Sequence, residues 1–577
     1  MPKPTTSDAA VEVRIRLWPA FLIVVVQFGV IFGASRFAST NVQNVICFGV
    51  IPMGAGLLLA AWWLVASRAP WRARIAGLVL AAVILAYSVL IQGPSGYLIL
   101  MIAVPTMSVG VAAALLVTCR MRWPARRWVV AGVMMALTLV FTGIRVDGIT
   151  GRMWPDWSWR WESRADTSEA PLPDLVVAAP GGVAELPAQP GPRDWPGFRG
   201  PARDGRVPGT VFSTDWSNDP PREVWRRRVG LGWSSFAVVG DYLFTQEQRG
   251  EEELVVCYRA DTGKPVWVNR IEARFDSPMG VGPRATPTYH QRRLYTLGAT
   301  GVVQCIDAAK GETVWRRDLT EDTGSGTPSW GFASSPLVVD GVAIVFSGKT
   351  EGKAVVAYDS ASGEQAWFGG EKGHGYSSAH LARISDVDQV LMVSDSGIQS
   401  FVPGSGGVLW SHAWEAEQYP RVIQPLLPDA NSVMIGATTG TGTRLLRVQG
   451  GGTAWDVEER WTNKRFRPYF NDCVYHKGYC YGFDGNRLVC IDLTTGERCW
   501  RGDNYGGQVL LFPDMDTLLV LSEAGEVVLV KAVPEKHEEV ARFKTIEGKT
   551  WNHPVVAHGK LFVRNAEEMA CFELAAR

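Results

Sequence analysis

The sequence predicts two domains of different fold class: an N-terminal all-α transmembrane domain of five helices and a C-terminal all-β domain built as an eight-bladed propeller. Residues 17–146 contain five long apolar runs, which indicate the first domain. Residues 195–577 contain six copies of a unit with Gly four residues before Trp, and eight short apolar strands that each follow polar residues. The chain has 57 basic and 57 acidic side chains, which argues against a nucleic-acid partner bound by bulk charge.

The five apolar runs are each long enough to cross a membrane as a helix. A span needs about 17 to 25 residues for a hydrocarbon core of roughly 30 Å. None of the runs contains an internal Lys, Arg, Asp or Glu, and such residues usually form the pathways of transporters, so transport by this domain alone is not expected. The runs cover residues 17–34, 45–66, 75–91, 97–118 and 128–144.

The basic residues predict the orientation of the chain. They lie mainly in the N-terminal segment and in the second and fourth loops, whereas the first and third loops contain only Arg36. The positive-inside rule therefore places residues 1–16 in the cytoplasm and everything beyond Arg145 outside. We expect a bacterial inner-membrane protein whose propeller is periplasmic. The basic residues of the inner side are Lys3, Arg14, Arg16, Arg68, Arg72, Arg74, Arg120, Arg122, Arg126 and Arg127.

Residues 147–194 are expected to connect the two domains. Four Trp residues, at positions 154, 157, 159 and 161, crowd just beyond the last apolar run. Aromatic side chains at that place commonly lie at the membrane interface. The Pro-rich stretch that follows cannot form a long helix or a central strand. We therefore predict a Trp-rich juxtamembrane segment and an extended linker.

The repeated unit predicts the blades of the propeller. A period of about 46 residues, with short apolar runs on both sides of a Gly turn, fits a four-stranded blade. The eight polar-to-apolar junctions begin near residues 233, 284, 333, 376, 422, 469, 506 and 551, and we interpret them as innermost strands. The segment 222–229 would complete blade 8 and close the ring, which removes an exposed sheet edge. The seventh blade has Phe543 where a Trp is expected, and seven blades are the alternative.

The unit resembles the quinoprotein-type propeller repeat, also called the pyrroloquinoline-quinone-like (PQQ-like) repeat. The opening segment 194–205, DWPGFRGPARDG, also resembles the leader of bacterial propellers of this type. In that family the Trp packs against the next blade. The resemblance therefore implies a docking role for Trp225, Trp267, Trp315, Trp367, Trp410, Trp455 and Trp500.

The resemblance implies two different functions. Some relatives are membrane-bound dehydrogenases that use PQQ with calcium, and another is a cofactor-free propeller of the outer-membrane assembly machinery. Residues 222–577 provide about 44 residues a blade, which suffices for strands and short turns. Calcium prefers six to eight oxygen ligands. The nearest candidate pair in the sequence, Asn471 and Asp472, is too small a group to form a calcium site. We therefore expect no metal and a binding or scaffold module for a protein partner or small ligand. The alternative is a PQQ-dependent dehydrogenase that oxidises a sugar or an alcohol and passes electrons to membrane quinone.

A ligand site is expected where the innermost strands begin, at one mouth of the central channel. Aromatic side chains with Arg suit an anionic or planar ligand. The alternative is that these residues are ordinary polar groups at strand ends. The candidates are Trp233, Arg284, Trp330, His374, Tyr376, His380, Arg421, Arg467, Tyr469, Asn471, Trp551 and His553.

One pair of cysteines is a candidate disulfide. A turn centred on Thr494 and Thr495 would place Cys490 opposite Cys499. An exported compartment permits a disulfide at this place.

Overall fold

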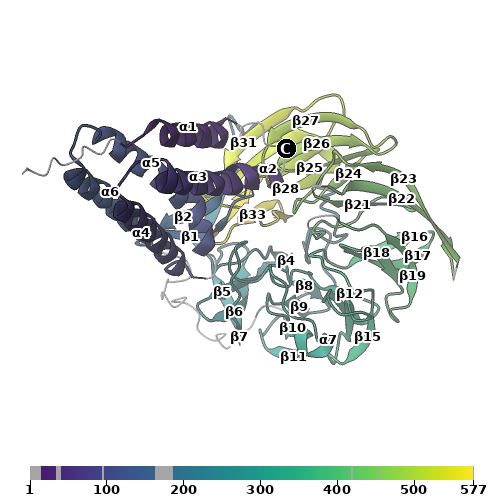
Figure 1. The fold of residues 1–577 in the computed structure, drawn as a ribbon. Helices are drawn as coiled ribbons and strands as arrows, with labels where there is room; N and C mark the ends of the chain where they lie inside the picture. The colour runs from purple at the N-terminus through teal and green to yellow at the C-terminus, as the bar shows by residue number, and fades with distance from the viewer. Residues whose placement is uncertain are drawn as a thin grey trace, which may run out of the picture. The chain divides into compact units, whose positions relative to one another are not determined.

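The computed structural model describes residues 15–33, 41–93, 96–151, 153–162, 183, 186–416, 420–438, 440–452 and 454–575. The chain divides into two compact units, Met1–Glu162 and Ser163–Arg577. The first unit is mostly helical and the second is a β-propeller, as Figure 1 shows. Lys3, Arg14, Arg36 and the linker prolines of residues 163–182 lie outside the described residues.

Within the described part of the first unit, four helical segments are long and apolar enough to cross a membrane: Gln43–Val65, Trp71–Leu90, Gly96–Val117 and Trp123–Gly143. They match the last four predicted runs. The first predicted run is a shorter apolar helix of 15 residues. The elements are α1 (Trp18–Phe32), α2 (Asn41–Val45), η2 (Ile46–Val50), α3 (Ile51–Val65), α4 (Trp71–Leu90), η3 (Gly96–Ile99), α5 (Leu100–Val117) and α6 (Trp123–Gly143).

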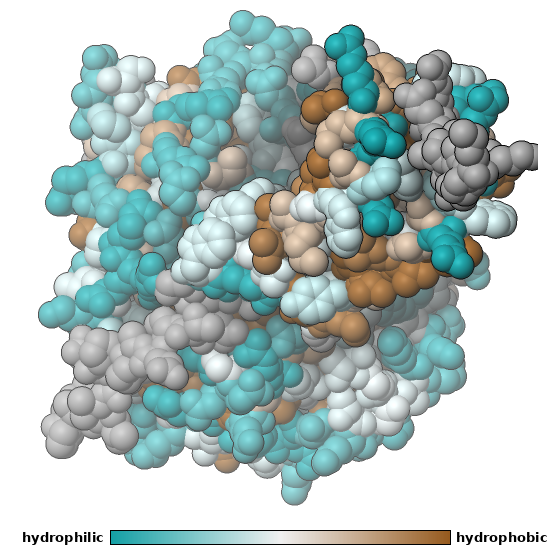
Figure 2. All heavy atoms as spheres, turned by 60° about the vertical axis from the view of Figure 1, so that its left-hand side comes forward, coloured by the Kyte–Doolittle hydropathy of each residue, from teal (hydrophilic) through white to brown (hydrophobic). Residues whose placement is uncertain are grey.

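Many large apolar side chains of the helical unit point outward. Leu57, Val65, Leu90 and Val117 are each more than 70% exposed. Figure 2 turns this unit toward the viewer and shows hydrophobic side chains gathered on its surface. Such a surface is unfavourable in water and fits contact with lipid.

The Trp-rich segment after the last helix is a β-hairpin. Strand β1 (Ile144–Ile149) pairs with β2 (Pro155–Trp159) in antiparallel register. The rings of Trp159 and Trp161 stack with their centroids 4.7 Å apart. The sequence predicted the cluster of aromatic rings but not the hairpin.

The second unit consists of eight four-stranded antiparallel sheets, which confirms the eight-bladed propeller and excludes the seven-bladed alternative. Blade 1 is β4 (Ala237–Val239), β5 (Tyr242–Arg249), β6 (Glu252–Arg259) and β7 (Pro265–Glu272). Blade 2 is β8 (Thr288–His290), β9 (Arg293–Leu297), β10 (Val302–Asp307) and β11 (Thr313–Asp318), followed by α7 (Leu319–Thr323). Blade 3 is β12 (Leu337–Val339), β13 (Val342–Phe346), β14 (Val355–Asp359) and β15 (Gln365–Gly369). Blades 4 to 6 are β16 (His380–Ile384), β17 (Val387–Ser394), β18 (Gly397–Phe401) and β19 (Val408–Ala413); β20 (Leu426–Asp429), β21 (Ser432–Ala437), β22 (Gly442–Gly451) and β23 (Ala454–Asn463); and β24 (Val474–His476), β25 (Tyr479–Asp484), β26 (Arg487–Asp492) and β27 (Arg498–Asn504). Blade 7 is β28 (Gln508–Phe512), η4 (Pro513–Met515), β29 (Thr517–Leu521), β30 (Glu526–Lys531) and β31 (Glu539–Lys544).

Blade 8 joins the two ends of the propeller. Its strands β32 (Val555–Ala557), β33 (Lys560–Arg564) and β34 (Glu568–Glu573) come from the end of the chain. Its fourth strand is β3 (Arg222–Arg228), which pairs with β34 so that Trp225 lies opposite Cys571. The ring is therefore closed by the strand that the sequence predicted.

The repeated Trp packs on the repeated Gly of the next blade. The Trp267 indole N–H donates to the Ala308 carbonyl at 3.0 Å, and its ring lies over Gly311. Gly311 has φ +75°, and a Cβ atom there would lie 2.6 Å from the ring. Trp225, Trp315 and Trp367 make the same contacts with the residues around Gly263, Gly363 and Gly406.

Blade 5 departs from this pattern and corrects the assignment of Trp455. Strands β22 and β23 have ten residues each, so Trp455 lies near the tip of their hairpin, opposite Gly450. Trp461 takes the docking position, because its indole N–H donates to the Leu493 carbonyl at 2.8 Å and its ring covers Gly496.

The neighbouring blades show two further variations of the docking contact. Trp410 donates to Gln389 of its own blade at 2.6 Å and shares an apolar cluster with Val448 of blade 5. Trp500 donates to the Val533 carbonyl at 2.8 Å.

Candidate functional site

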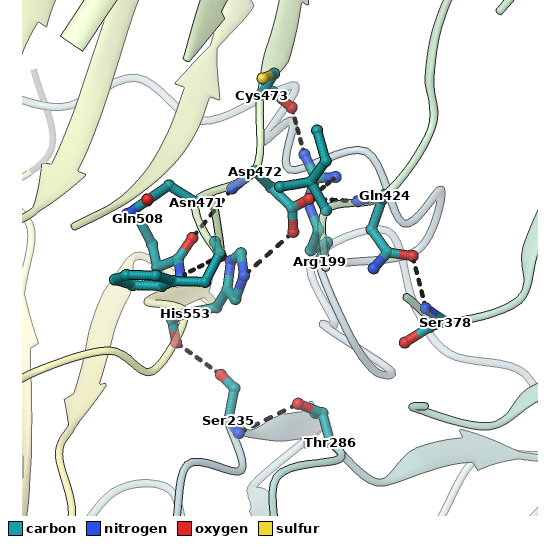
Figure 3. A network of polar contacts seen from close by, with 12 residues as sticks. Arg199, Ser235, Thr286, Ser378, Gln424, Asn471, Asp472, Cys473, Gln508 and His553 are labelled. Atoms are coloured by element: carbon teal, nitrogen blue, oxygen red, sulfur yellow. Dashed lines mark hydrogen bonds and ion pairs between the residues drawn. The ribbon is translucent and has the colours of Figure 1, made fainter. Parts of the chain in front are cut away.

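A ring of hydrogen bonds joins the blades around the channel. At the residue that precedes or begins the innermost strands of blades 2 to 7, a side chain accepts a hydrogen bond from the backbone N–H of the equivalent residue in the preceding blade. We call this the inter-blade ring, and Figure 3 shows most of it. Its donor–acceptor pairs are Ser235–Thr286 (3.2 Å), Thr286–Ser335 (2.9 Å), Ser335–Ser378 (2.9 Å), Ser378–Gln424 (3.1 Å), Gln424–Asp472 (2.7 Å) and Asp472–Gln508 (3.4 Å).

The ring closes through blade 8, where the Gln508 side-chain amide donates to the Trp551 carbonyl at 3.2 Å and the Ser235 hydroxyl donates to the His553 carbonyl at 2.7 Å. These positions are the polar residues from which the sequence predicted eight innermost strands. Their polarity is explained by the need to satisfy a backbone N–H that would otherwise be buried without a partner.

The segment that precedes the propeller lies against the innermost strands. We call residues 195–207 the leader segment. Trp195 exchanges two backbone hydrogen bonds with Val238 of blade 1, at 2.8 and 2.7 Å. The Tyr289 N–H of blade 2 donates to Pro196, and Val207 donates to Leu511 of blade 7. The leader segment therefore contacts strands from well-separated parts of the ring.

The leader segment places two arginine side chains in the interior of the propeller. Arg199 is 2% exposed and donates to the Cys473 carbonyl at 2.6 Å. Arg203 is 6% exposed and donates to the carbonyls of Ser335 and Pro336, at 2.9 and 3.0 Å. Both arginines therefore lie at the level of the inter-blade ring. Ser335 is one of the ring positions, and Cys473 directly follows the ring position Asp472.

Asp472 is the carboxylate of this interior. Its Oδ1 lies 3.6 Å from Arg199 Nη1, and its Oδ2 lies 3.4 Å from His553 Nε2. Burial alone raises the pKa of Asp472, but Arg199 and His553 outweigh burial, so its pKa lies below the usual value. Burial lowers the pKa of His553, and burial together with Arg203 and Arg199 lowers the pKa of His380 to about 3. Both imidazoles are therefore neutral near pH 7.

Aromatic rings from five blades meet at the mouth of the channel. We call them the collar: Trp233, Trp330, Tyr376, Tyr469, Phe470 and Trp551. Neighbouring centroids are 4.9 Å apart for Trp233–Trp551, 5.2 Å for Phe470–Trp551, 5.6 Å for Tyr469–Phe470, 6.3 Å for Trp330–Tyr469 and 4.8 Å for Trp330–Tyr376. The Lys549 ammonium lies 4.9 Å from the Trp551 ring. Such a surface suits a planar or aromatic group.

The predicted site residues fall into three groups. Trp233, Trp330, Tyr376, Tyr469 and Trp551 form the collar, and His374 lies beside it with its ring 5.1 Å from Tyr376. Asn471, His380 and His553 lie buried in the interior.

The third group consists of three arginines whose hydrogen bonds and ion pair go to neighbouring loops and strand ends. Arg284 donates to Ser277 and Gly280. Arg421 donates to Ser394 and Trp414, and Arg467 pairs with Asp484 at 2.9 Å. Burial raises the pKa of Tyr376 of the collar, and Arg284 lies near enough for its charge to oppose that rise, but the hydrogen bonds of all three arginines go to groups outside the collar.

Sequence reasoning missed the largest contributors to the interior, Arg199 and Arg203. The resemblance of residues 194–205 to a family leader drew attention to the segment that contains them, but it did not predict that the two arginines lie in the interior. It also missed Phe470 and Lys549, although the aromatic run at 469–470 was a usable signal.

The residues around Asn471 and Asp472 do not fit a calcium site. The Asp472 carboxylate already accepts the Gln424 N–H and faces Arg199 and His553. The Asn471 amide donates to Gly507 at 2.5 Å. A divalent cation there would lie beside a guanidinium, which is unfavourable. Within the described ranges no three His, Cys, Asp or Glu residues group as metal ligands.

Cys490 and Cys499 lie next to each other in blade 6. The register pairs Cys490 with Trp500 rather than with Cys499, which is the extra residue of a β-bulge. Both are free thiols; Cys490 is buried and Cys499 is exposed. Burial, and then the neighbouring Cys499, raise the pKa of the Cys490 thiol. A disulfide between them stays a prediction.

Comparison with known proteins supports the repeat type. Residues 276–501 match the family model described as outer membrane protein assembly factor BamB. The quinohemoprotein alcohol dehydrogenase ADH-IIG of Pseudomonas putida is 28% identical over 235 residues, which cover 38% of this chain and 32% of the relative. The outer membrane protein assembly factor BamB of Yersinia pestis is 21% identical over 308 residues, which cover 49% of this chain and 71% of the relative.

Among solved structures, the quinohemoprotein alcohol dehydrogenase ADHIIG from Pseudomonas putida HK5 has a TM-score of 0.49 at 14% identity, covering 68% of this chain and 83% of that one. The chain spans about a third of the length of the first dehydrogenase relative. The family match and the eight blades confirm the resemblance to the PQQ-like propeller repeat.

Proposed function

We propose that this protein is a membrane-anchored binding or scaffold module whose propeller binds a partner protein at its rims without chemical turnover. One observation carries the proposal: the channel interior is occupied by the chain's own leader segment, and the Asp472 carboxylate is committed to Arg199 and His553. The loops of a rigid propeller, by contrast, are free to vary and suit recognition.

The same proposal places the propeller in the bacterial periplasm. The loop between α3 and α4 together with the first turn of α4, and the loop between α5 and α6, carry exposed arginines such as Arg68, Arg72, Arg120 and Arg122. The positive-inside rule assigns these loops to the cytoplasm. With the N-terminus also inside, and with the shorter helix α1 counted as a span beside the four longer helices, the propeller lies outside the inner membrane.

The second candidate function is PQQ-dependent oxidation of a sugar or an alcohol. The printed names of two relatives, both quinohemoprotein alcohol dehydrogenases, favour it. The collar provides flat aromatic faces on which a planar cofactor such as PQQ would stack. The interior argues against it, because the Asp472 carboxylate is paired with the Arg199 guanidinium and also contacts the neutral His553 imidazole, so it offers no free carboxylate to calcium.

The two functions differ in a direct measurement. Full-length protein in detergent is mixed with PQQ and calcium, and binding is followed by calorimetry while dye-linked oxidation of sugars and alcohols is assayed. We expect neither stoichiometric binding nor turnover. Stoichiometric binding together with turnover would establish the dehydrogenase and overturn the scaffold proposal.

A second experiment tests the rims directly. A photo-crosslinking amino acid replaces Ser329, which is exposed beside the collar, or Thr262, which is exposed on the turn between β6 and β7 at the opposite rim. Arg460, exposed on the outer strand β23, is the control position. We expect one rim position to give a discrete adduct in living cells that Arg460 does not give. Equal adducts at all three positions, or none, would contradict binding at a rim.

A further inference from the structure

The buried cluster that Arg199, Arg203 and Asp472 form around the leader segment holds more positive than negative charge. Arg199, Arg203 and Asp472 are each at most 6% exposed. The two guanidiniums carry two positive charges, and the one carboxylate carries one negative charge. His380 and His553 are neutral near pH 7 because burial and the neighbouring arginines lower their pKa values. One buried positive charge is therefore left over.

Arg203 is the cation without a counter-charge. Among the residues that the structure describes, no carboxylate forms an ion pair with it, and its hydrogen bonds go to two neutral carbonyls. Burial and the repulsion from Arg199 lower the pKa of Arg203 to about 10, which still leaves it charged at pH 7. Asp204, the nearest acidic residue in sequence, instead accepts the backbone N–H of Arg206 at 3.0 Å.

Several donor atoms of this interior have no hydrogen-bond partner among the residues that the structure describes. They include Nε of Arg199 and Nε of Arg203, together with Nδ1 of His380, which donates in one of the two neutral tautomers. A buried donor or charge without a partner is costly, because folding removes the water that would solvate it. The excess charge and these donors point to the same kind of ligand, an anion.

We propose that the interior of the propeller binds one small monovalent anion, a halide or a carboxylate, between Arg199 and Arg203. A monovalent anion would neutralise the single excess positive charge, whereas a divalent anion would leave an excess of one negative charge. Planar guanidiniums bind oxyanions and halides through their N–H groups, and burial strengthens the contact. The leader segment supplies both arginines, so the anion fastens it to blades 3 and 6, which Arg203 and Arg199 contact.

The experiment measures stabilisation by defined anions. Full-length protein in detergent is kept in sodium HEPES at constant ionic strength, and chloride, bromide or acetate replaces the bulky buffer anion. Thermal unfolding is followed by tryptophan fluorescence. Because the anion binds the native state, we expect a saturable rise in Tm of roughly 2 °C or more. The chloride and acetate arms distinguish a halide from a carboxylate ligand.

Arg203→Met is the diagnostic variant, and Arg383→Met, at an exposed arginine of blade 4, is its matched control. We expect Arg203→Met to remove the anion dependence and Arg383→Met to keep it. An equal dependence in both variants, or the same Tm in every salt, would overturn the proposal.

Line broadening of ³⁵Cl in nuclear magnetic resonance gives a second readout on the unmodified protein, so the test does not depend on the folding of a variant. We expect saturable broadening that acetate reverses if both anions share the site. Broadening that never saturates would indicate an adventitious ion only and would also overturn the proposal.

Discussion

The Asp472 carboxylate contacts three groups from different parts of the chain. It accepts the Gln424 N–H at 2.7 Å and lies within ion-pair distance of Arg199 and His553. Removing one partner of a buried ion pair costs more than the pair contributes, because the remaining charge stays buried without compensation.

Asp472→Asn tests this dependence. The amide oxygen still accepts from Gln424, but Arg199 loses its counter-charge, so we expect the free energy of unfolding to fall by about 3–5 kcal/mol at pH 7. Asp388→Asn, in the exposed pair with Arg383 at 3.0 Å, is the control and should cost less than about 1 kcal/mol. Denaturant unfolding followed by fluorescence measures both variants, and equal losses would contradict the argument.

The pH dependence of this pair follows from the lowered pKa of Asp472. Its contribution is present above the unfolded value of about 3.9 and is lost as the pH falls through the lower folded value. The difference between the wild type and Asp472→Asn should therefore be constant from pH 5 to 8 and shrink below pH 4.

Glu253 behaves in the opposite way. Its side chain is buried in blade 1, where it accepts the Ala299 N–H at 3.1 Å, and burial raises its pKa to about 7. Between the usual value and pH 7 the unfolded chain ionises while the folded chain stays protonated, so stability falls as pH rises through this range.

Glu253→Gln should remove that loss. We expect the variant to match the wild type near pH 4 and to gain up to about 3 kcal/mol relative to it at pH 8, because one pKa unit corresponds to about 1.4 kcal/mol. Unfolding measured at pH 5, 6, 7 and 8 checks the slope. The half-buried neighbour Glu252→Gln, whose carboxylate pairs with Arg270 at 3.0 Å on the surface, controls for the loss of one carboxyl, and a parallel slope in wild type and Glu253→Gln would refute the prediction.

At the scale of the element, the docking contact requires Gly for two separate reasons: a positive φ and close contact with a Trp ring. Gly311 adopts φ +75° and also lies under the Trp267 ring. Gly341 adopts the same φ, but a Cβ there would meet no atom within 4 Å. The two glycines therefore separate backbone conformation from ring contact.

Gly311→Ala and Gly341→Ala form a matched pair. We expect Gly341→Ala to cost about 1–2 kcal/mol, which is the penalty of a left-handed L-residue. Gly311→Ala should cost at least about 1–3 kcal/mol more, because the methyl group displaces the Trp267 ring. Thermal and denaturant unfolding of the two variants measure the difference, and equal costs would show that the docking contact contributes little.

The blades could be predicted from the sequence because their signals are local and repeated. The Gly and Trp of each unit lie four residues apart, and the inter-blade ring adds one polar residue for each blade. Trp455 was misassigned because Gly451 also precedes it by four residues at the tip of the long β22–β23 hairpin. The length of the outer strands decides which Trp docks, and the spacing between Gly and Trp carries no information about that length.

The interior of the propeller could be predicted only in part. Most collar residues and His553 could be predicted, because they lie where an innermost strand begins and this position recurs in every blade. Arg199 contacts Cys473 across 274 residues of sequence, and no period links the leader segment to the blades. Contacts made once, between distant segments, leave no pattern in a single sequence.

At the scale of the whole molecule, two natural cysteines report the proposed orientation. Of the nine cysteines, Cys119 and Cys499 are exposed, and the others are buried. Cys119 lies between α5 and α6, in a loop that the positive-inside rule assigns to the cytoplasm. Cys499 lies on β27 of the propeller, which the same rule assigns to the periplasm.

A membrane-impermeant maleimide applied to intact cells, whose outer membrane has been made permeable, should label Cys499 and leave Cys119 unlabelled. A mild reductant is added first, because a disulfide with Cys490 would block Cys499. Disrupting the inner membrane should expose Cys119 as well. Cys119→Ser and Cys499→Ser identify each labelled site by mass spectrometry. Labelling of Cys119 in intact cells would place the arginine-rich loops outside and reverse the proposed topology, whatever the propeller binds.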